Sequence, residues 1–129
     1  GAEPGPYRLQ AAIAAVHATA DSAAATDWQT IVALYDRLLT VTPSPIVALN
    51  RAVAVGMASG PQVGLAALER VAASGALDGY YLLPAARADL LRRLGDYGKA
   101  AAFYRVALAG APTQPERDFF ARRLDEVGG

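Results

Sequence analysis

Few side chains in this sequence are of the types that perform catalysis, and their surroundings favour structural roles. The one histidine, His17, stands among alanine and valine in an expected helix, so we expect a partly buried residue that packs or forms a hydrogen bond. Asp21 and Asp27 flank a polar loop, where helix capping is more common than an acid and base pair. The sequence has no nucleophile elbow, phosphate-binding glycine loop or cluster of metal ligands. We therefore expect no enzymatic activity, no cofactor and no metal site.

The segment "RRLGDYGKAAAFYR", residues 92–105, mixes cations with aromatic side chains. Such a mixture can bind single-stranded nucleic acid, because bases stack on aromatic rings. Here the aromatic residues recur with alanine at helical spacing, which is typical of a packing stripe. The chain also has 12 basic and 12 acidic residues, so no net charge attracts it to nucleic acid or to a membrane surface. We expect neither of these as a partner.

Length and composition indicate a single packed domain. A chain of 129 residues with 53% hydrophobic residues can bury a core of its own. Cysteine is absent, which excludes disulfides and thiol catalysis and suits a reducing cytoplasm, our expected location. No apolar run approaches the roughly 18 residues of a membrane span. Because the sequence opens Gly-Ala-Glu, we expect an excised domain with a disordered or tag-derived segment at 1–5.

Alanine-rich segments separated by glycine and proline predict an all-α fold. We expect seven helices, at about 6–20, from behind Asp27 to Pro43, from Pro45 to Gly60, 61–73, 81–94 with Gly95 as its stop, from behind Asp96 to Pro112, and from Pro115 to 127.

The elements should bury one apolar face each. The residues expected on these faces are Leu9, Ile13, Val16, Trp28, Ile31, Val32, Tyr35, Leu38, Leu39, Ile46, Leu49, Val53, Met57, Val63, Leu65, Leu68, Val71, Tyr97, Ala100, Ala101, Tyr104, Ala107, Leu108, Phe119, Phe120, Leu124 and Val127. On the last helix, Arg117, Arg122 and Arg123 should face water.

An internal repeat organises these elements. One offset of 69 positions relates Trp28 to Tyr97, and the same offset relates three further landmarks, Tyr35 to Tyr104, Leu39 to Leu108 and Pro43 to Pro112. A weaker copy lies midway, around Gly64 and Leu68, which gives a period near 34 residues, the signature of tetratricopeptide helix pairs. We expect a right-handed α-solenoid with repeats at about 6–43, 44–78 and 79–112 and a capping helix at 115–127. Ala88, Ala100 and Ala107 should permit close helix contact, with Tyr97 and Tyr104 as spacers.

The concave side of such a stack usually binds partner segments through the first helix of each pair. Residues expected to face it are Thr19, Leu49, Asn50, Val53, Met57, Asp89, Arg92 and Arg93. Asn50 either bonds to a neighbouring helix or recognises a partner, since a buried amide needs a bonding partner. The run "LNRA" is similar to the second repeat of the tetratricopeptide clamps that grip chaperone C-terminal carboxylates. At the matching position of the third repeat this chain has Ala86 rather than a cation, and the first repeat has Thr19. No carboxylate clamp is therefore predicted.

Four blocks that cover nearly the whole chain carry a family resemblance: "GPYRLQAAIAAVHA", "DWQTIVALYDRLL", "PSPIVALNRAVAV" and "YYLLPAARADLLRRLGDYGKAAAFYRVAL". In order and spacing they resemble the C-terminal tetratricopeptide-like extension of one group of bacterial extracytoplasmic-function (ECF) sigma factors. The resemblance implies a cytoplasmic regulator of transcription initiation that acts through protein contacts. The expected partners are the protein's own sigma core and RNA polymerase, with a small protein of the Asp-Gly-Pro-Phe type as a further candidate. The promoter-binding helices are not in this sequence.

Two other classes of function remain open. A free-standing tetratricopeptide adaptor would use the same concave side to bind a peptide or a partner helix. An enzyme or a small-molecule receptor would require a concave polar constellation that the sequence does not provide.

Overall fold

The computed structural model describes residues 5–18 and 25–128, and this part of the chain is all-α. It forms seven helices and no strand, as the sequence predicts. The helices are α1 (Pro6–Ala18), α2 (Trp28–Val41), α3 (Pro45–Ser59), α4 (Pro61–Ala72), α5 (Leu82–Arg93), α6 (Tyr97–Gly110) and α7 (Gln114–Glu126).

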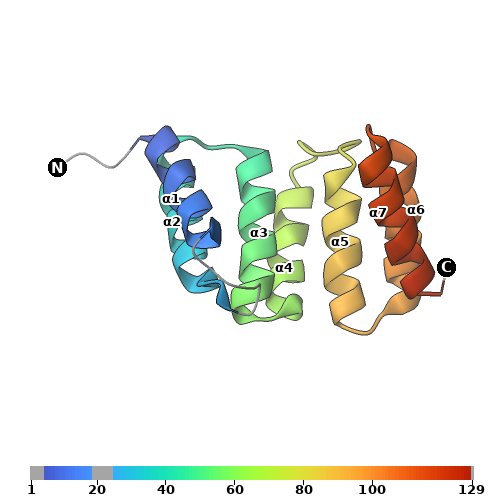
Figure 1. Ribbon diagram of the computed structural model, residues 1–129. Helices are drawn as coiled ribbons and strands as arrows, with labels where there is room; N and C mark the ends of the chain where they lie inside the picture. The colour runs from blue at the N-terminus through green and yellow to red at the C-terminus, as the bar shows by residue number, and fades with distance from the viewer. Residues whose placement is uncertain (1–4, 19–24, 129) are drawn as a thin grey trace.

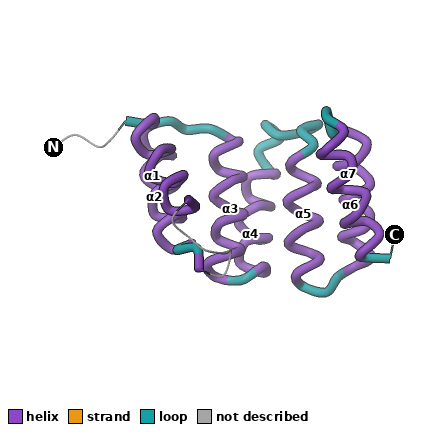
Figure 2. The backbone as a smooth tube through the Cα atoms, in the orientation of Figure 1, coloured by secondary structure: helices purple, strands orange, loops and turns teal. Residues whose placement is uncertain are grey.

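The helices form a row in which α1, α3, α5 and α7 lie toward the viewer and α2, α4 and α6 lie behind them, from α1 and α2 at one end to α6 and α7 at the other (Figure 1). Successive helices run in opposite directions, so the described connections lie alternately at the two edges of the row (Figure 2). Each helix contacts the next one in the chain, and α3 also contacts α5. The contact between α3 and α5 brings together residues that are distant in the sequence, such as Gly56 and Arg93, which are 37 positions apart.

Local signals set most of the helix ends. The carboxylate of Asp27 accepts a hydrogen bond from the Thr30 amide at 3.1 Å, and Asp96 accepts one from the Lys99 amide at 3.3 Å, which confirms both as N-caps. Gly95 follows α5 with a φ of +84°, a left-handed conformation that suits glycine. The sequence placed α1 to residue 20, and residues 19 and 20 lie outside the described part.

The buried side chains form three clusters along the row. The first joins α1, α2 and α3 around Leu9 and Ile31, the second joins α3, α4 and α5 around Leu68 and Leu90, and the third joins α5, α6 and α7 around Tyr104. Because α3 and α5 each contribute to two clusters, neighbouring clusters are connected through shared helices. No single helix pair encloses its own apolar face.

Small residues mark the closest helix contacts. Ala88, Ala100 and Ala107 are each 0% exposed, as expected for positions where two helices approach closely. Gly56 of α3 and Gly64 of α4 form an even closer contact. A Cβ atom built on Gly64 would lie 2.5 Å from the Cα of Gly56, so both backbones touch directly there.

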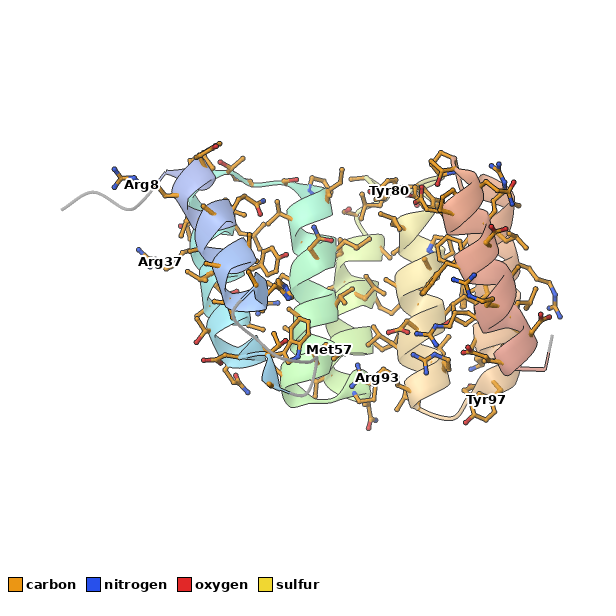
Figure 3. All side chains as sticks on the ribbon, in the orientation of Figure 1. Arg8, Arg37, Met57, Tyr80, Arg93 and Tyr97 are labelled. Carbon is orange, nitrogen blue, oxygen red and sulfur yellow. The ribbon has the colours of Figure 1, made fainter. Side chains whose placement is uncertain are left out.

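Several residues expected in the core are exposed instead. Ile46, Val63 and Tyr97 are 47%, 51% and 54% exposed, and each lies in the first turn of its helix. Side chains of a helix lean toward its N-terminus, so those of the first turn are directed toward the end of their own helix, where fewer residues surround them. Figure 3 shows Tyr97 at the edge of the row, directed away from the helices. Tyr97 is therefore no spacer between helices, whereas Tyr104 is buried and fulfils that prediction.

On the last helix, α7, the exposed and buried side chains differ in part from those predicted. Phe120 is buried, but Phe119 is 43% exposed. Arg117 and Arg123 do not simply face water: the Arg117 guanidinium donates to the Ala111 carbonyl at 3.1 Å, and Arg123 lies 5.2 Å from the centre of the Phe119 ring. Arg122 is exposed as predicted.

Candidate functional site

A groove with a volume of about 600 Å³ lies between α3, α5, α6 and α7. We call it the central groove and define it by its lining, which is mainly apolar. It is lined by Leu49, Asn50, Val53, Leu82, Ala85, Ala86, Asp89, Tyr104, Pro115, Glu116, Phe119 and Phe120. Its size is within the range of sites that accept several side chains of a partner or a small organic molecule.

The structure brings four of the eight predicted binding residues into this groove. Leu49, Asn50 and Val53 lie within two turns of α3, and Asp89 comes from α5. Asn50 is exposed, so its amide needs no bond to a neighbouring helix. Met57 lies one turn beyond Val53 and does not line the groove. Thr19 lies outside the described residues.

The two predicted arginines, Arg92 and Arg93, form hydrogen bonds within the protein. The Arg92 guanidinium donates to Asp89 Oδ1 at 2.7 Å and to the Tyr104 hydroxyl at 3.2 Å. The hydrogen bond to Asp89 is the main reason why the pKa of Arg92 is raised. Arg93 donates to the Gly56 carbonyl at 3.2 Å and so connects α5 to α3. Neither arginine lines the central groove; Figure 3 shows Arg93 near the end of α5, away from the middle of the helix.

Helix α7 supplies groove residues that the sequence analysis did not predict. Glu116 lies in its first turn, where the Thr113 hydroxyl caps the helix by accepting from the Glu116 amide at 3.3 Å. The same hydroxyl donates to Glu116 Oε1 at 2.7 Å, and the Tyr81 hydroxyl donates to Glu116 Oε2. Thr113 and Glu116 have the spacing of a capping box, which is a local signal. Nothing local indicates that α7 lines the same groove as α3 and α5.

Tyr81 and Glu116 shift each other's pKa. The hydrogen bond from Tyr81 lowers the pKa of Glu116, with a further contribution from Thr113, so the carboxylate stays charged. The same bond stabilises the protonated phenol and raises the pKa of Tyr81 to about 12. Burial raises the pKa of Tyr104, the tyrosine that lines the central groove. Both tyrosines are therefore neutral donors or acceptors near neutral pH, and Glu116 is an anion.

A second cavity of about 520 Å³ lies between the residue 77–81 connection, α5 and α6. It shares no lining residue with the central groove. Its one cation, Arg87, donates to both oxygens of Glu69 at 2.8 and 3.0 Å and lies 5.3 Å from the centre of the Phe103 ring. Arg87 thus joins α4, α5 and α6, which is a structural role.

The remaining chemistry-bearing residues of the sequence lie apart from both cavities. His17 is exposed and packs edge-on against Trp28, with ring centres 5.2 Å apart, so it packs as predicted but is not partly buried. Asp21 is outside the described residues. Among residues 5–18 and 25–128, no three His, Asp or Glu side chains gather as a metal site would require. In the same part of the chain, every helix is too short or too polar to cross a membrane.

The chain is similar to an uncharacterized protein of Rhizobium meliloti (strain 1021). The two are 41% identical over 124 residues, which are 96% of this chain and 29% of that protein. The chain therefore spans less than a third of its relative's length. No family model matches the chain, and no solved structure matches it.

Proposed function

We propose that this chain is a regulatory, protein-binding extension of a bacterial ECF sigma factor, acts in the cytoplasm and has no catalytic role. The central groove carries the proposal, because it offers apolar surface and a few polar groups from four helices but no cluster of nucleophile, base and metal ligand among the described residues. The resemblance of the four sequence blocks supplies the family. The relative from Rhizobium supports an extension, since most of that protein lies outside the aligned segment.

The proposed architecture is a right-handed tetratricopeptide-like solenoid. Its helix pairs are α1 with α2, α3 with α4, and α5 with α6, and α7 covers the last pair. The contact between α3 and α5 supports this arrangement, because the first helices of successive pairs adjoin on the concave side of such a stack. The fully buried Ala88 and Ala100 support it as well, since they match small positions of the repeat.

In this proposal the central groove binds the protein's own sigma core or RNA polymerase. A docked segment would hold the sigma domains in one arrangement and so change the rate of transcription initiation. A small protein of the Asp-Gly-Pro-Phe type is a further candidate for the same surface. The extension itself contacts no DNA, in accord with its net charge of 0.

The test is a promoter-reporter assay on the full-length protein. Asn50→Trp places a large side chain at an exposed groove position and should block docking without disturbing the core. Gln62→Trp is the matched control, because Gln62 is exposed on α4 and outside the groove. We expect Asn50→Trp to change reporter output and to reduce co-purification of the sigma core or polymerase, and Gln62→Trp to leave both unchanged. Equal behaviour of the two folded variants would refute the proposal.

A free-standing peptide adaptor is the alternative that the same groove supports. The complete reading frame separates the two, because the sigma-factor proposal requires promoter-binding helices upstream of Gly5. A start codon directly before this segment would leave only the adaptor.

A further inference from the structure

The charges of the central groove all have one sign. Asp89 and Glu116 are the charged residues that line it, and no lysine, arginine or histidine does. Arg92 neutralises Asp89 through a 2.7 Å ion pair. Glu116 differs, because its hydrogen-bond donors Tyr81 and Thr113 are neutral. No cation of the described part of the chain forms an ion pair with Glu116, so the groove holds one uncompensated negative charge.

Glu116 retains capacity for a further donor. Each of its two carboxylate oxygens accepts one hydrogen bond within the protein, and a carboxylate has about four acceptor positions. The two existing bonds also fix the carboxylate in one orientation, because Tyr81 and Thr113 hold it from different segments. A cationic donor would therefore meet a charge that is already oriented, which reduces the entropy cost of pairing.

The apolar surface next to Glu116 is incompletely covered. Phe119 lies one turn farther along α7 and is 43% exposed, and Leu82 of α5 and Val53 of α3 are half-buried in the same groove. A side chain of a partner that covered these residues would remove apolar area from water, which favours binding. The groove thus combines an apolar floor with an anion at one side.

We propose that the central groove binds a protein segment that places a large apolar side chain against Phe119 and Leu82 and a lysine or arginine beside Glu116. This inference rests on the proposed protein-binding function and adds the chemistry of the partner. The negative charge of the groove determines that the partner's charged side chain is positive. If Arg92 and Arg93 faced the groove, an acidic segment would fit, but their bonds to Asp89 and Gly56 leave the anion at Glu116 to select a basic one.

The test is selection of phage-displayed random 12-residue peptides on the whole 129-residue chain. Peptides that bind should be enriched in sequences that combine lysine or arginine with a large apolar residue. Synthetic copies of them should bind Glu116→Gln about 10-fold more weakly than the wild type, since a partly buried ion pair loses its charge while the side chain keeps its shape. Asp125→Asn is the control, because Asp125 is an exposed carboxylate on the same helix and outside the groove.

Asn50→Trp should also abolish binding of these peptides, because it fills the groove. Enrichment of acidic or uncharged peptides would overturn the inference, and so would an equal effect of Glu116→Gln and Asp125→Asn. Failure to enrich any peptide, or binding that survives Asn50→Trp, would overturn it as well.

The two proposals can fail separately. If Asn50→Trp alters reporter output in the full-length protein but Glu116→Gln does not, the groove regulates transcription and the inference about the basic partner is wrong. If basic peptides bind through Glu116 but Asn50→Trp leaves transcription unchanged, the groove has the proposed chemistry and the sigma-factor function is wrong.

Discussion

The contact between Gly56 of α3 and Gly64 of α4 allows a quantitative test of the packing between these two helices. In Gly64→Ala, the new Cβ would lie 2.5 Å from Gly56 Cα, 2.7 Å from Gly56 N and 3.1 Å from the Ala52 carbonyl oxygen. All three are backbone atoms, so no side-chain rotation can relieve the overlap. Since non-bonded carbon atoms pack at about 3.5–4.0 Å, α3 and α4 must separate by roughly 1–1.5 Å.

The expected cost follows from two opposed effects. Overpacking of a core typically costs about 1–3 kcal/mol, and the restriction to backbone atoms favours the upper part of this range. Replacing a helical glycine with alanine returns at most about 1 kcal/mol. We therefore expect Gly64→Ala to lower the free energy of unfolding by about 2 kcal/mol, a decrease in Tm of roughly 6–10 °C for a domain of this size.

Thermal and urea unfolding followed by circular dichroism measure this effect. Gly98→Ala is the matched control: Gly98 is helical in α6, and a Cβ there would meet nothing within 4 Å. It should leave stability unchanged or raise it by up to about 1 kcal/mol. Gly56→Ala should fall between the two, because its Cβ would meet the Leu90 side chain at 2.5 Å, and a side chain can move. A Gly64→Ala protein as stable as the wild type would refute the close backbone contact.

Three further expectations concern a core position, a helix cap and a titrating pair. Ala107→Glu should abolish cooperative unfolding in a thermal melt, because it buries an unpaired carboxylate at a 0% exposed position; Ala109→Glu, on the exposed face, should melt like the wild type. Ser44→Ala should cost about 1 kcal/mol in urea unfolding through loss of the cap on Val47, and an unchanged midpoint would exclude that cap. The pKa of Tyr81 in the folded protein is about 12, so its contribution to the free energy of unfolding is complete below pH 10 and is lost as the pH rises toward 12. Tyr81→Phe should remove this fall in stability between pH 10 and 12 in urea unfolding. A profile identical to that of the wild type would contradict the bond to Glu116.

The sequence predicted features that depend on a few neighbouring residues. Asp27 and Asp96 each cap a helix by accepting a hydrogen bond from the amide three residues later in the chain. Gly95 ends α5 in a left-handed conformation. Each of these depends on backbone groups within one helical turn, so the residue types alone are sufficient. The alanines at 88, 100 and 107 could also be recognised, because the repeat places small residues where helices approach.

Side-chain surroundings were predicted less well. Ile46, Val63 and Tyr97 fit the apolar period of their helices but lie in first turns and are exposed. Periodicity gives the direction of a side chain around the helix axis but not its height relative to the neighbour. The same limit applies to Arg92 and Arg93, which fit the expected concave face but bond to Asp89, Tyr104 and Gly56 instead.

The sequence by itself determined the all-α class, the helix ends and four members of the candidate site, because helical periodicity and capping act within a single segment. The tertiary structure decided that α7 lies along the groove and brings Glu116 there, and that Arg92 and Arg93 do not face it. These features depend on contacts between segments far apart in the chain, such as Tyr81 with Glu116 and Arg93 with Gly56. The sign of charge in the groove is therefore a property of how the helices pack, although every residue that sets it can be read in the sequence.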